Sequence, residues 1–488
     1  MIDFDEIPYD ILKPGNYIEI KPNYDRMGVA PYPAKALLIV QMLAGGLAVP
    51  GRLYRLTRPD DGRALFGPGS VGADMVFAYK QANKTTDVYA IALADAVGAL
   101  AAAGTLTLAG TATASGELPL WIGAARIGVT VAVGTGAAQI AVAVAAAVNA
   151  VPTLPVTAAV AAATVTLTAR HKGEVGNGID LSLARYEDDA VPAGISAVIA
   201  PMAGGTTNPL LQSVLDTIAT RWFTDMAVPW DDAATMQALA ADLAARYRAM
   251  GRKDGHAYLG HRGTFAAVAA KGALTNSPFI SGIGAKGAAS PPWCWAASAC
   301  GIASDHLAND PARQLGTLAL PGIVGPRLED RFIDTEQDLL LKGGISTFTV
   351  LDDGTVTIDR LVTTYKTSPL GIADRAWLDI MVPKTASRIR YDWASYVGLI
   401  YPRAKLADDD SPAAANAAAI VTPGRMHGSW AARCTLYERL GWIEGASDTV
   451  AQSVFDRDLT DKNRLNARQQ IRIIGNKMVL AASLEFQV

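Results

Sequence analysis

Two hydrophobic runs in the first hundred residues have no polar face. Residues 35–42 read KALLIVQM, and residues 87–94 read DVYAIALA. Strands that are apolar on both sides are typical of parallel sheets covered by helices. We expect a further strand at residues 54–57 and a helix at residues 71–82, directly after the turn residues Phe66-Gly67-Pro68-Gly69-Ser70. The first part of the chain therefore predicts one half of an α/β layer.

The alternation of strands and helices returns after residue 205. The expected strands cover residues 222–228, 256–259 and 277–282, and the expected helices cover residues 233–250, 264–272 and 292–307. Asp231 and Asp232 precede the first of these helices, where a carboxylate can accept hydrogen bonds from the unpaired N–H groups of the first turn. This order favours a doubly wound α/β sheet, which the two earlier strands would join.

Residues 96–205 differ in composition from the chain on either side. Alanine, valine, threonine and glycine dominate this stretch, and residues 105–108 and 164–168 alternate between polar and apolar positions. Such alternation predicts strands, whereas residues 137–149 read as an alanine-rich helix. We expect a small α+β domain inserted into the α/β core.

The last third of the chain combines a hairpin with helices. Residues 346–351 and 355–361 alternate around Asp352-Asp353-Gly354, a sequence typical of a turn between antiparallel strands. Helices are expected at residues 377–396 and 424–440.

Both ends of the chain carry a hydrophobic run that reads as a strand. Residues 17–21 (YIEIK) follow Pro14-Gly15-Asn16, and residues 478–486 (MVLAASLEF) follow Gly475-Asn476. An unpaired strand edge is a template for aggregation, so each run needs a partner strand. We expect the two arms to exchange strands with neighbouring subunits. The expected contact residues are Tyr17, Ile18, Glu19, Ile20, Met478, Leu480, Leu484 and Phe486. The alternative, in which both arms fold back onto their own chain, stays open.

The expected fold class is α+β and multidomain. Its parts are an N-terminal arm (residues 1–25), a discontinuous α/β core (26–95 and 206–350), the inserted α+β domain (96–205), a C-terminal α+β domain (351–470) and a C-terminal strand arm (471–488).

The composition of the chain limits its environment and partners. Half of the 488 residues are hydrophobic and only 18% are charged. The most apolar stretch, residues 140–163, is broken by Asn149, Pro152 and Pro155, so we expect no direct membrane insertion. The other explanation is a subunit that hides much of its surface against copies of itself, because obligate interfaces are more apolar than ordinary surface.

The charge and the cysteine content of the chain also limit its partners and its environment. The formal net charge is −3 and no basic tract is present, so nucleic-acid binding is not expected. The acidic N-terminus lacks the apolar segment of a signal peptide, and Cys294, Cys300 and Cys434 are too few for a disulfide framework. We expect a protein that is made and kept in a cytoplasm.

No candidate catalytic or metal site stands out. His256 and His261 lack a third ligand at the right spacing, and the chain has no HExxH motif, phosphate loop or GxSxG motif. Residues 282–287 (GIGAKG) resemble a dinucleotide-binding motif, but no acidic residue follows at the usual distance. The acidic residues 408–410 are typical of a solvated loop. We expect no enzymatic activity and no cofactor, and the alternative is a nucleotide-binding α/β enzyme.

Several segments together resemble the tail sheath protein of contractile-tailed phages, especially the Mu-like kind. They are Phe66-Gly67-Pro68-Gly69-Ser70, Leu307-Ala308-Asn309-Asp310-Pro311-Ala312-Arg313, Glu329-Asp330-Arg331-Phe332, Gly343-Gly344-Ile345-Ser346-Thr347-Phe348-Thr349-Val350, Ile389-Arg390-Tyr391-Asp392, Tyr401-Pro402-Arg403-Ala404-Lys405-Leu406 and Lys462-Asn463-Arg464-Leu465-Asn466. The inserted segment also resembles one carried by Mu-like sheaths, including Thr168-Ala169-Arg170-His171-Lys172-Gly173. Lys462 stands where the family pattern has a proline.

The resemblance implies a structural subunit of the virion tail, assembled in the host bacterial cytoplasm. Such a subunit forms stacked rings, usually of six, around an inner tail tube, and contacts baseplate and tail terminator proteins. We expect a basic helix with Lys384, Arg388 and Arg390 to face the tube, unless it is an ordinary solvated helix face. A further alternative is a tube subunit of another contractile secretion machine.

Overall fold

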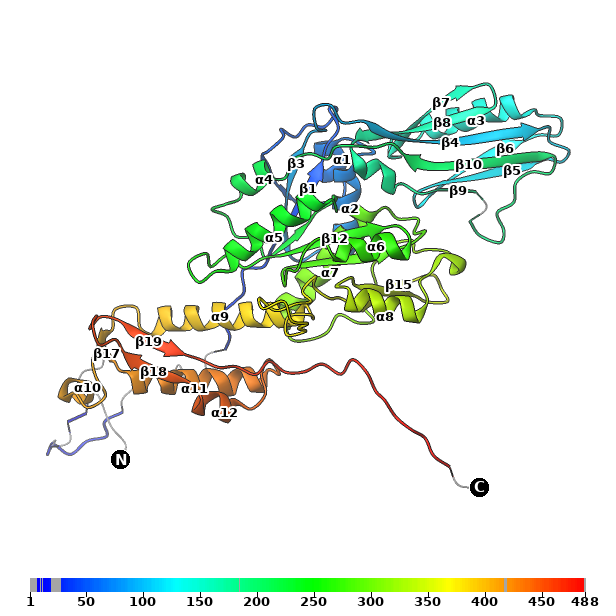
Figure 1. Cartoon of the computed structure of the whole chain (residues 1–488). Coiled ribbons are helices and arrows are strands. Elements are labelled where there is room, and N and C mark those ends of the chain that lie inside the picture. Colours follow the sequence, from blue (N-terminus) through cyan, green and yellow to red (C-terminus); the bar gives the residue numbers. More distant parts are fainter. Residues whose placement is uncertain are drawn as a thin grey trace. The chain divides into compact units, whose positions relative to one another are not determined.

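The computed structural model describes residues 7–8, 10, 12–18, 28–183, 185–416 and 419–486. The chain divides into two compact units (Figure 1). The larger unit holds residues 33–387 and 476–488, and the smaller unit holds residues 1–32 and 388–475. Among the helices of the described residues, none is both long and apolar enough to cross a lipid bilayer.

The larger unit is built on a six-stranded sheet with the order β13-β12-β11-β1-β3-β2. Its strands are β1 (Lys35–Gln41), β2 (Leu53–Leu56), β3 (Asp87–Leu93), β11 (Asp225–Ala227), β12 (His256–Arg262) and β13 (Ile280–Ala285). All neighbours pair in parallel except β2, which runs antiparallel to β3 at the edge. The prediction that strands from both sides of residues 96–205 join one sheet is therefore confirmed, and the apolar run of β1 is fully buried.

Helices surround this sheet. They are α1 (Asp61–Phe66), α2 (Val71–Ala82), α4 (Gln212–Thr217), α5 (Ala233–Tyr247), α6 (Phe265–Gly272), α7 (Pro292–Asn309) and α8 (Asp334–Lys342), with 3-10 turns at Glu174–Gly178 and Leu328–Asp330. Helices α2 and α7 pack on one another, and α7 also packs on β12, β11 and β1. The predicted cap of α5 is confirmed, because the Asp232 side chain accepts a hydrogen bond from the Thr235 N–H.

Strand β13 begins three residues later than the sequence predicts. The Ser277 N–H donates to the Thr364 hydroxyl at 3.0 Å, and the Phe279 N–H donates to the Ser277 hydroxyl at 3.2 Å. These bonds hold the preceding residues in a turn, so the parallel pairing with β12 starts only at Ile280.

Residues 101–203, here called the insertion, form two sheets of their own. One has the order β10-β4-β8-β7 and the other has the order β6-β5-β9. The elements are β4 (Ala101–Gly110), β5 (Gly116–Ile122), β6 (Ala125–Val131), α3 (Ala137–Asn149), β7 (Val156–Ala161), β8 (Thr164–Lys172), β9 (Leu181–Leu183) and β10 (Ile195–Ala203). Helix α3 contacts β4, β6, β7 and β8 (Figure 1), and the buried positions alternate along β4 and β8 as predicted.

The remaining elements come after α8 in the sequence. They are β14 (Thr347–Val350), β15 (Val356–Arg360), α9 (Met381–Ile400), β16 (Lys405–Leu406), α10 (Pro412–Asn416), β17 (Ile420–Val421), α11 (Pro423–Arg439), α12 (Ala446–Ala451), β18 (Val454–Arg457) and β19 (Leu465–Arg468). Strands β14 and β15 form the predicted hairpin. Strands β18 and β19 form an antiparallel hairpin in the smaller unit that the sequence analysis does not predict.

Candidate functional site

The first candidate site is the crevice at the carboxyl ends of β1 and β11. The strand order reverses between these two strands, which is where doubly wound sheets bind ligands. Here the buried Gln41 side chain occupies the position. Its Oε1 accepts from Trp230 Nε1 at 3.2 Å, and its Nε2 donates to Asp95 Oδ1 at 2.7 Å and to the Lys172 carbonyl oxygen at 2.8 Å. Both ends of the Gln41 side-chain amide are therefore already satisfied within the chain.

The insertion also fills part of this crevice, through His171 near the end of β8. The buried His171 ring accepts from the Val71 N–H, at the start of α2, at 3.2 Å through Nε2, so its Nδ1 carries the proton and donates to Asp95 Oδ1 at 2.9 Å. Burial alone would raise the pKa of Asp95, but hydrogen bonds from His171 and the Lys172 N–H lower it below its ordinary value. The insertion is thus bonded to the core where a nucleotide would otherwise sit.

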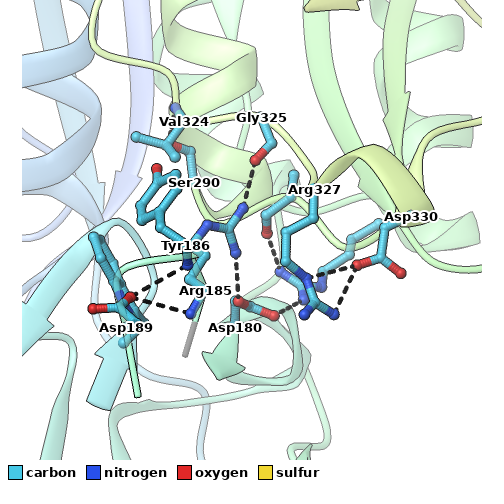
Figure 2. A network of polar contacts seen from close by, with 12 residues as sticks. Asp180, Arg185, Tyr186, Asp189, Ser290, Val324, Gly325, Arg327 and Asp330 are labelled. Carbon is cyan, nitrogen blue, oxygen red and sulfur yellow. Dashed lines mark hydrogen bonds and ion pairs between the residues drawn. The ribbon is translucent and has the colours of Figure 1, made fainter. Parts of the chain in front are cut away.

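A second polar junction joins the insertion to the core, as Figure 2 shows. Arg185 donates to Asp180 Oδ2 at 3.4 Å and to the Gly325 carbonyl oxygen at 2.6 Å. The other Asp180 oxygen accepts from Arg262 of β12. Asp189 holds the local loop by accepting the Arg185 N–H at 3.1 Å. One carboxylate between two guanidinium groups therefore fixes the insertion on the core.

An open pocket of about 320 Å³ lies beside these junctions. Its lining includes Asn208, Trp230, Arg262 and Lys271. Arg262 is paired with Asp180, and Lys271 donates to Asp231 Oδ1 at 3.0 Å. Both cations are compensated within the chain, so the pocket presents no free charge for an anionic ligand.

The GxGxxG-like residues 282–287 do not form a nucleotide loop. Gly282 and Gly284 lie inside β13 rather than between a strand and a helix. A Cβ atom at Gly282 would lie 2.1 Å from His261 Nε2, and one at Gly284 would lie 2.4 Å from a Val268 methyl carbon. The glycines are therefore explained by close side-chain packing, which removes the main support for a dinucleotide site.

His256, His261, Cys300 and Cys434 are buried, and Cys294 is half-buried. His256 Nε2 lies 2.8 Å from the Ser281 hydroxyl, both buried, and burial lowers the pKa of His256 well below its ordinary value. Burial likewise raises the pKa of the Cys294 and Cys300 thiols, which keeps them protonated. Within the described ranges, no three His, Cys, Asp or Glu side chains are grouped so that they could hold a metal ion.

The three cations of α9 that the sequence suggests for tube contact have different surroundings. Lys384 is one-tenth exposed and its Nζ lies 2.6 Å from Asp225 Oδ1. Arg388 is 6% exposed and lies against the rings of Tyr32 and Trp442. Arg390 is half-buried. Lys384 and Arg388 are thus engaged inside the chain, and the spacing of charges in the sequence does not reveal this. Tube contact by these residues stays a prediction.

The C-terminal segment is anchored at one point and then leaves the body of the larger unit. Asn476 donates to the Ala312 carbonyl oxygen at 2.9 Å and accepts from the Gln314 N–H at 3.2 Å. Met478 packs against the core, whereas Leu480, Leu484 and Phe486 are 75–95% exposed. Residues 478–486 form no strand within their own chain.

The N-terminal arm is described only in part. Tyr17 is 43% exposed and Ile18 is 86% exposed, and neither lies in a strand. Glu19 and Ile20 lie outside the described residues.

Among the residues that the structure describes, the hairpin of β18 and β19 is a sheet of two strands, so no third strand pairs with either of its edges there. Its connection is a turn in which Asp458 accepts from the N–H groups of Thr460 and Asp461, both at 2.9 Å. The run Asp458-Leu459-Thr460-Asp461 between two short alternating segments is the signal that could have predicted it.

Comparison with known proteins agrees with this architecture. Residues 204–364 match the family described as phage tail sheath protein central domain. The chain is 30% identical over 485 residues to the Mu-like prophage FluMu tail sheath protein of Haemophilus influenzae, covering 99% of each chain. Among solved structures, its fold is similar to chains of the anti-feeding prophage helical sheath in the contracted state (TM-score 0.50) and of the anti-feeding prophage baseplate in the contracted state (TM-score 0.51). Each is 11% identical, with 97% of this chain and 98% of the other covered. The chain belongs to the phage tail sheath family.

Proposed function

We propose that this protein is the structural subunit of a contractile tail sheath. Copies polymerise as stacked rings, six to a ring, around an inner tail tube, and contraction drives the tube through the host cell envelope. The observation that supports this proposal best is the exposed apolar C-terminal segment, residues 478–486. The subunit needs no cofactor and catalyses no reaction, because the energy for contraction is stored when the less stable extended lattice assembles.

The C-terminal segment has the pattern of a strand that waits for a partner. Its even positions are Met478, Leu480, Ala482, Leu484 and Phe486, all apolar, and in a strand they would share one face. Full burial of a leucine or phenylalanine stabilises by about 1.5–3 kcal/mol. Three such side chains can therefore supply about 4.5–9 kcal/mol toward a junction between subunits, in addition to the backbone hydrogen bonds.

The open hairpin of β18 and β19 is the acceptor that we propose for a neighbour's arm. A two-stranded sheet is marginally stable alone, and added strands stabilise it. Strand addition to a free edge gives affinity through main-chain hydrogen bonds. The N-terminal arm, with Tyr17, Ile18, Glu19 and Ile20, would supply a second added strand. Joined in this way, subunits can rotate and slide during contraction without separating.

The other partners follow from this role. The sheath would contact the inner tube, the baseplate and the tail terminator in the virion tail, after assembly in the host bacterial cytoplasm. Arg390, which is half-buried, is the α9 cation that we propose for tube contact, beside Lys384 and Arg388.

The arm proposal is tested by replacing Leu480 and Leu484 together with serine. Loss of two buried leucines should weaken each junction by about 3–6 kcal/mol, which is at least about a hundredfold in affinity. Sedimentation and negative-stain microscopy should show soluble subunits in place of wide striated tubes. Leu210→Ser is the matched control, because Leu210 is 80% exposed in the larger unit and lies outside the arms. Normal tubes from the double variant would refute the C-terminal arm.

A further inference from the structure

The smaller unit contains a fully buried carboxylate, Asp392 of α9, which binds a segment far away in the sequence. Its Oδ1 accepts from the Ala30 N–H at 2.6 Å. Its Oδ2 accepts from Arg433 Nε at 3.1 Å, from Arg433 Nη2 and from the Tyr437 hydroxyl at 2.6 Å. Both oxygens are therefore occupied, and one of them is used for the backbone of residue 30.

Arg433 of α11, the positive member of the ion pair with Asp392, binds the same segment. It is 3% exposed, and its Nη1 and Nη2 both donate to the Gly28 carbonyl oxygen at 3.4 Å. Burial alone would lower the pKa of Arg433, but the hydrogen bond and charge of Asp392 raise it above its ordinary value. An N–H at Ala30 and a carbonyl at Gly28 thus meet opposite members of one buried ion pair, which fixes the register of the segment.

Tyr32 adds a third point of attachment. The Arg388 guanidinium lies 5.0 Å from the Tyr32 ring centroid and 5.5 Å from that of Trp442, and the Tyr391 ring meets Tyr32 edge-on at 5.4 Å. The Nε and Nη1 atoms of Arg388 have no hydrogen-bond partner in the described part of the chain. The charge of Asp392 and the aromatic rings therefore compensate the Arg388 charge together, and a cation–π contact strengthens when water is excluded.

The position of this cluster along the chain gives it a mechanical meaning. Residues 28–32 separate the N-terminal arm from β1, which begins at Lys35 in the centre of the six-stranded sheet. A pull on an arm without an intermediate attachment would act directly on that central strand. An attachment at residues 28–32 would pass the pull to α9 and α11 instead.

We propose that Asp392, Arg433 and Arg388, here called the arm seat, fix the base of the N-terminal arm so that tension between subunits is carried by α9 and α11 and not by β1. This inference rests on the proposed function, in which the N-terminal arm links neighbouring subunits. Charged groups suit such a seat because an ion pair accepts the backbone in one register only, whereas an apolar clamp would let the segment slip.

The test uses the full chain with two substitutions that leave the ion pair in place. Ala30→Pro removes the backbone N–H that donates to Asp392 Oδ1, and Tyr32→Leu removes the ring on Arg388 while keeping an apolar side chain. Asp379→Asn is the matched control, because Asp379 pairs with Arg360 at 2.8 Å within the larger unit. Circular dichroism checks that each variant folds. Hydrogen exchange of the peptide covering residues 28–32 reports on the seat itself, and microscopy reports on tubes.

Exchange at the Ala30 amide should rise at least about tenfold in Tyr32→Leu and stay unchanged in Asp379→Asn, whereas Ala30→Pro has no amide hydrogen at this position and is read by its tubes. Both seat variants should form few or broken tubes, whereas the control polymerises normally. Unchanged exchange, or faster exchange with intact tubes, would overturn the seat. Deletion of residues 1–20 separates this outcome from a failure of the arm model. If the chain without residues 1–20 polymerises normally, the proposed link between subunits through the N-terminal arm is wrong. If only the seat variants form normal tubes, the arm seat is wrong and the link through the N-terminal arm is not contradicted.

Discussion

Replacement of Lys384 by methionine would remove one half of a buried ion pair at the amino edge of the central sheet. Lys384 Nζ lies 2.6 Å from Asp225 Oδ1 and 2.9 Å from the Thr224 carbonyl oxygen. The two charged side chains are 10% and 4% exposed. After the substitution, Asp225 would keep only the hydrogen bond from the Tyr258 hydroxyl, at 2.7 Å, among its side-chain donors within the described residues.

The expected loss follows from the cost of leaving a charge buried without its partner. Breaking a buried pair by removing one member costs about 3–5 kcal/mol. At about 2–4 °C per kcal/mol for a domain of this order of size, the melting temperature should fall by about 6–20 °C. The double variant Lys384→Met with Asp225→Asn removes the uncompensated charge, and it should recover at least half of the loss, because replacing both members of a buried pair is often nearly neutral.

Thermal and urea denaturation of the soluble subunit measure both variants, with Lys342→Met as the control. Lys342 pairs with Asp338 at 2.5 Å, but both side chains are more than half exposed, so its loss should cost less than about 1 kcal/mol. A Lys384→Met variant as stable as this control would refute the reasoning. It would mean that Lys384 is free to meet another molecule, as the sequence-based prediction of tube contact requires.

Two further substitutions test the interior. Burial beside Trp293 raises the pKa of Asp74 to about 7. The folded state therefore favours the protonated acid, and its contribution to stability is complete below the ordinary pKa of the unfolded chain and is lost as pH rises through about 7. Asp74→Asn should accordingly raise the melting temperature at pH 8 and have little effect at pH 4, and equal shifts at both values would contradict this. Gly282→Ala places a Cβ atom 2.1 Å from His261 Nε2, so it should destabilise the larger unit by about 1–3 kcal/mol or more in urea unfolding. An unchanged midpoint would show that the histidine can move aside.

Local signals in the sequence predict elements whose ends are set locally. Helix α2 begins and ends where predicted because Ser70 caps it, accepting from the Ala73 N–H at 3.0 Å. Strand β13 is displaced because Thr364, far along the chain, bonds to Ser277. The hairpin of β18 and β19 has strands of four residues each, so its alternation is weak and the turn residues between the strands are its main sequence signal.

The candidate site shows the same limit more strongly. Lys384 and Arg388 occur with Arg390 as a basic cluster on α9, and in the sequence nothing distinguishes them from a solvated stripe. Their partners Asp225 and Tyr32 are separated from them by more than a hundred residues. Charge spacing within a helix reports on neighbours one turn away, whereas a buried pair depends on which distant segment the fold brings opposite. The alternation in residues 478–486 is different, because a strand pattern records the need for a partner even when that partner is on another chain.

The closed crevice explains how a sheet of nucleotide-binding type can serve in a structural protein. Ligands bind such sheets at the reversal of strand order because backbone N–H groups and helix N-termini are left unsatisfied there. In this chain the Val71 N–H at the start of α2 is satisfied by His171, and Gln41 is satisfied by Asp95, Trp230 and the backbone of the insertion. The groups that a ligand would need are thus used to attach the insertion to the core. Among the described residues, the exposed apolar side chains of the C-terminal segment and the edges of β18 and β19 have no such internal partner, and the proposed strand exchange would assign these surfaces to contacts between subunits.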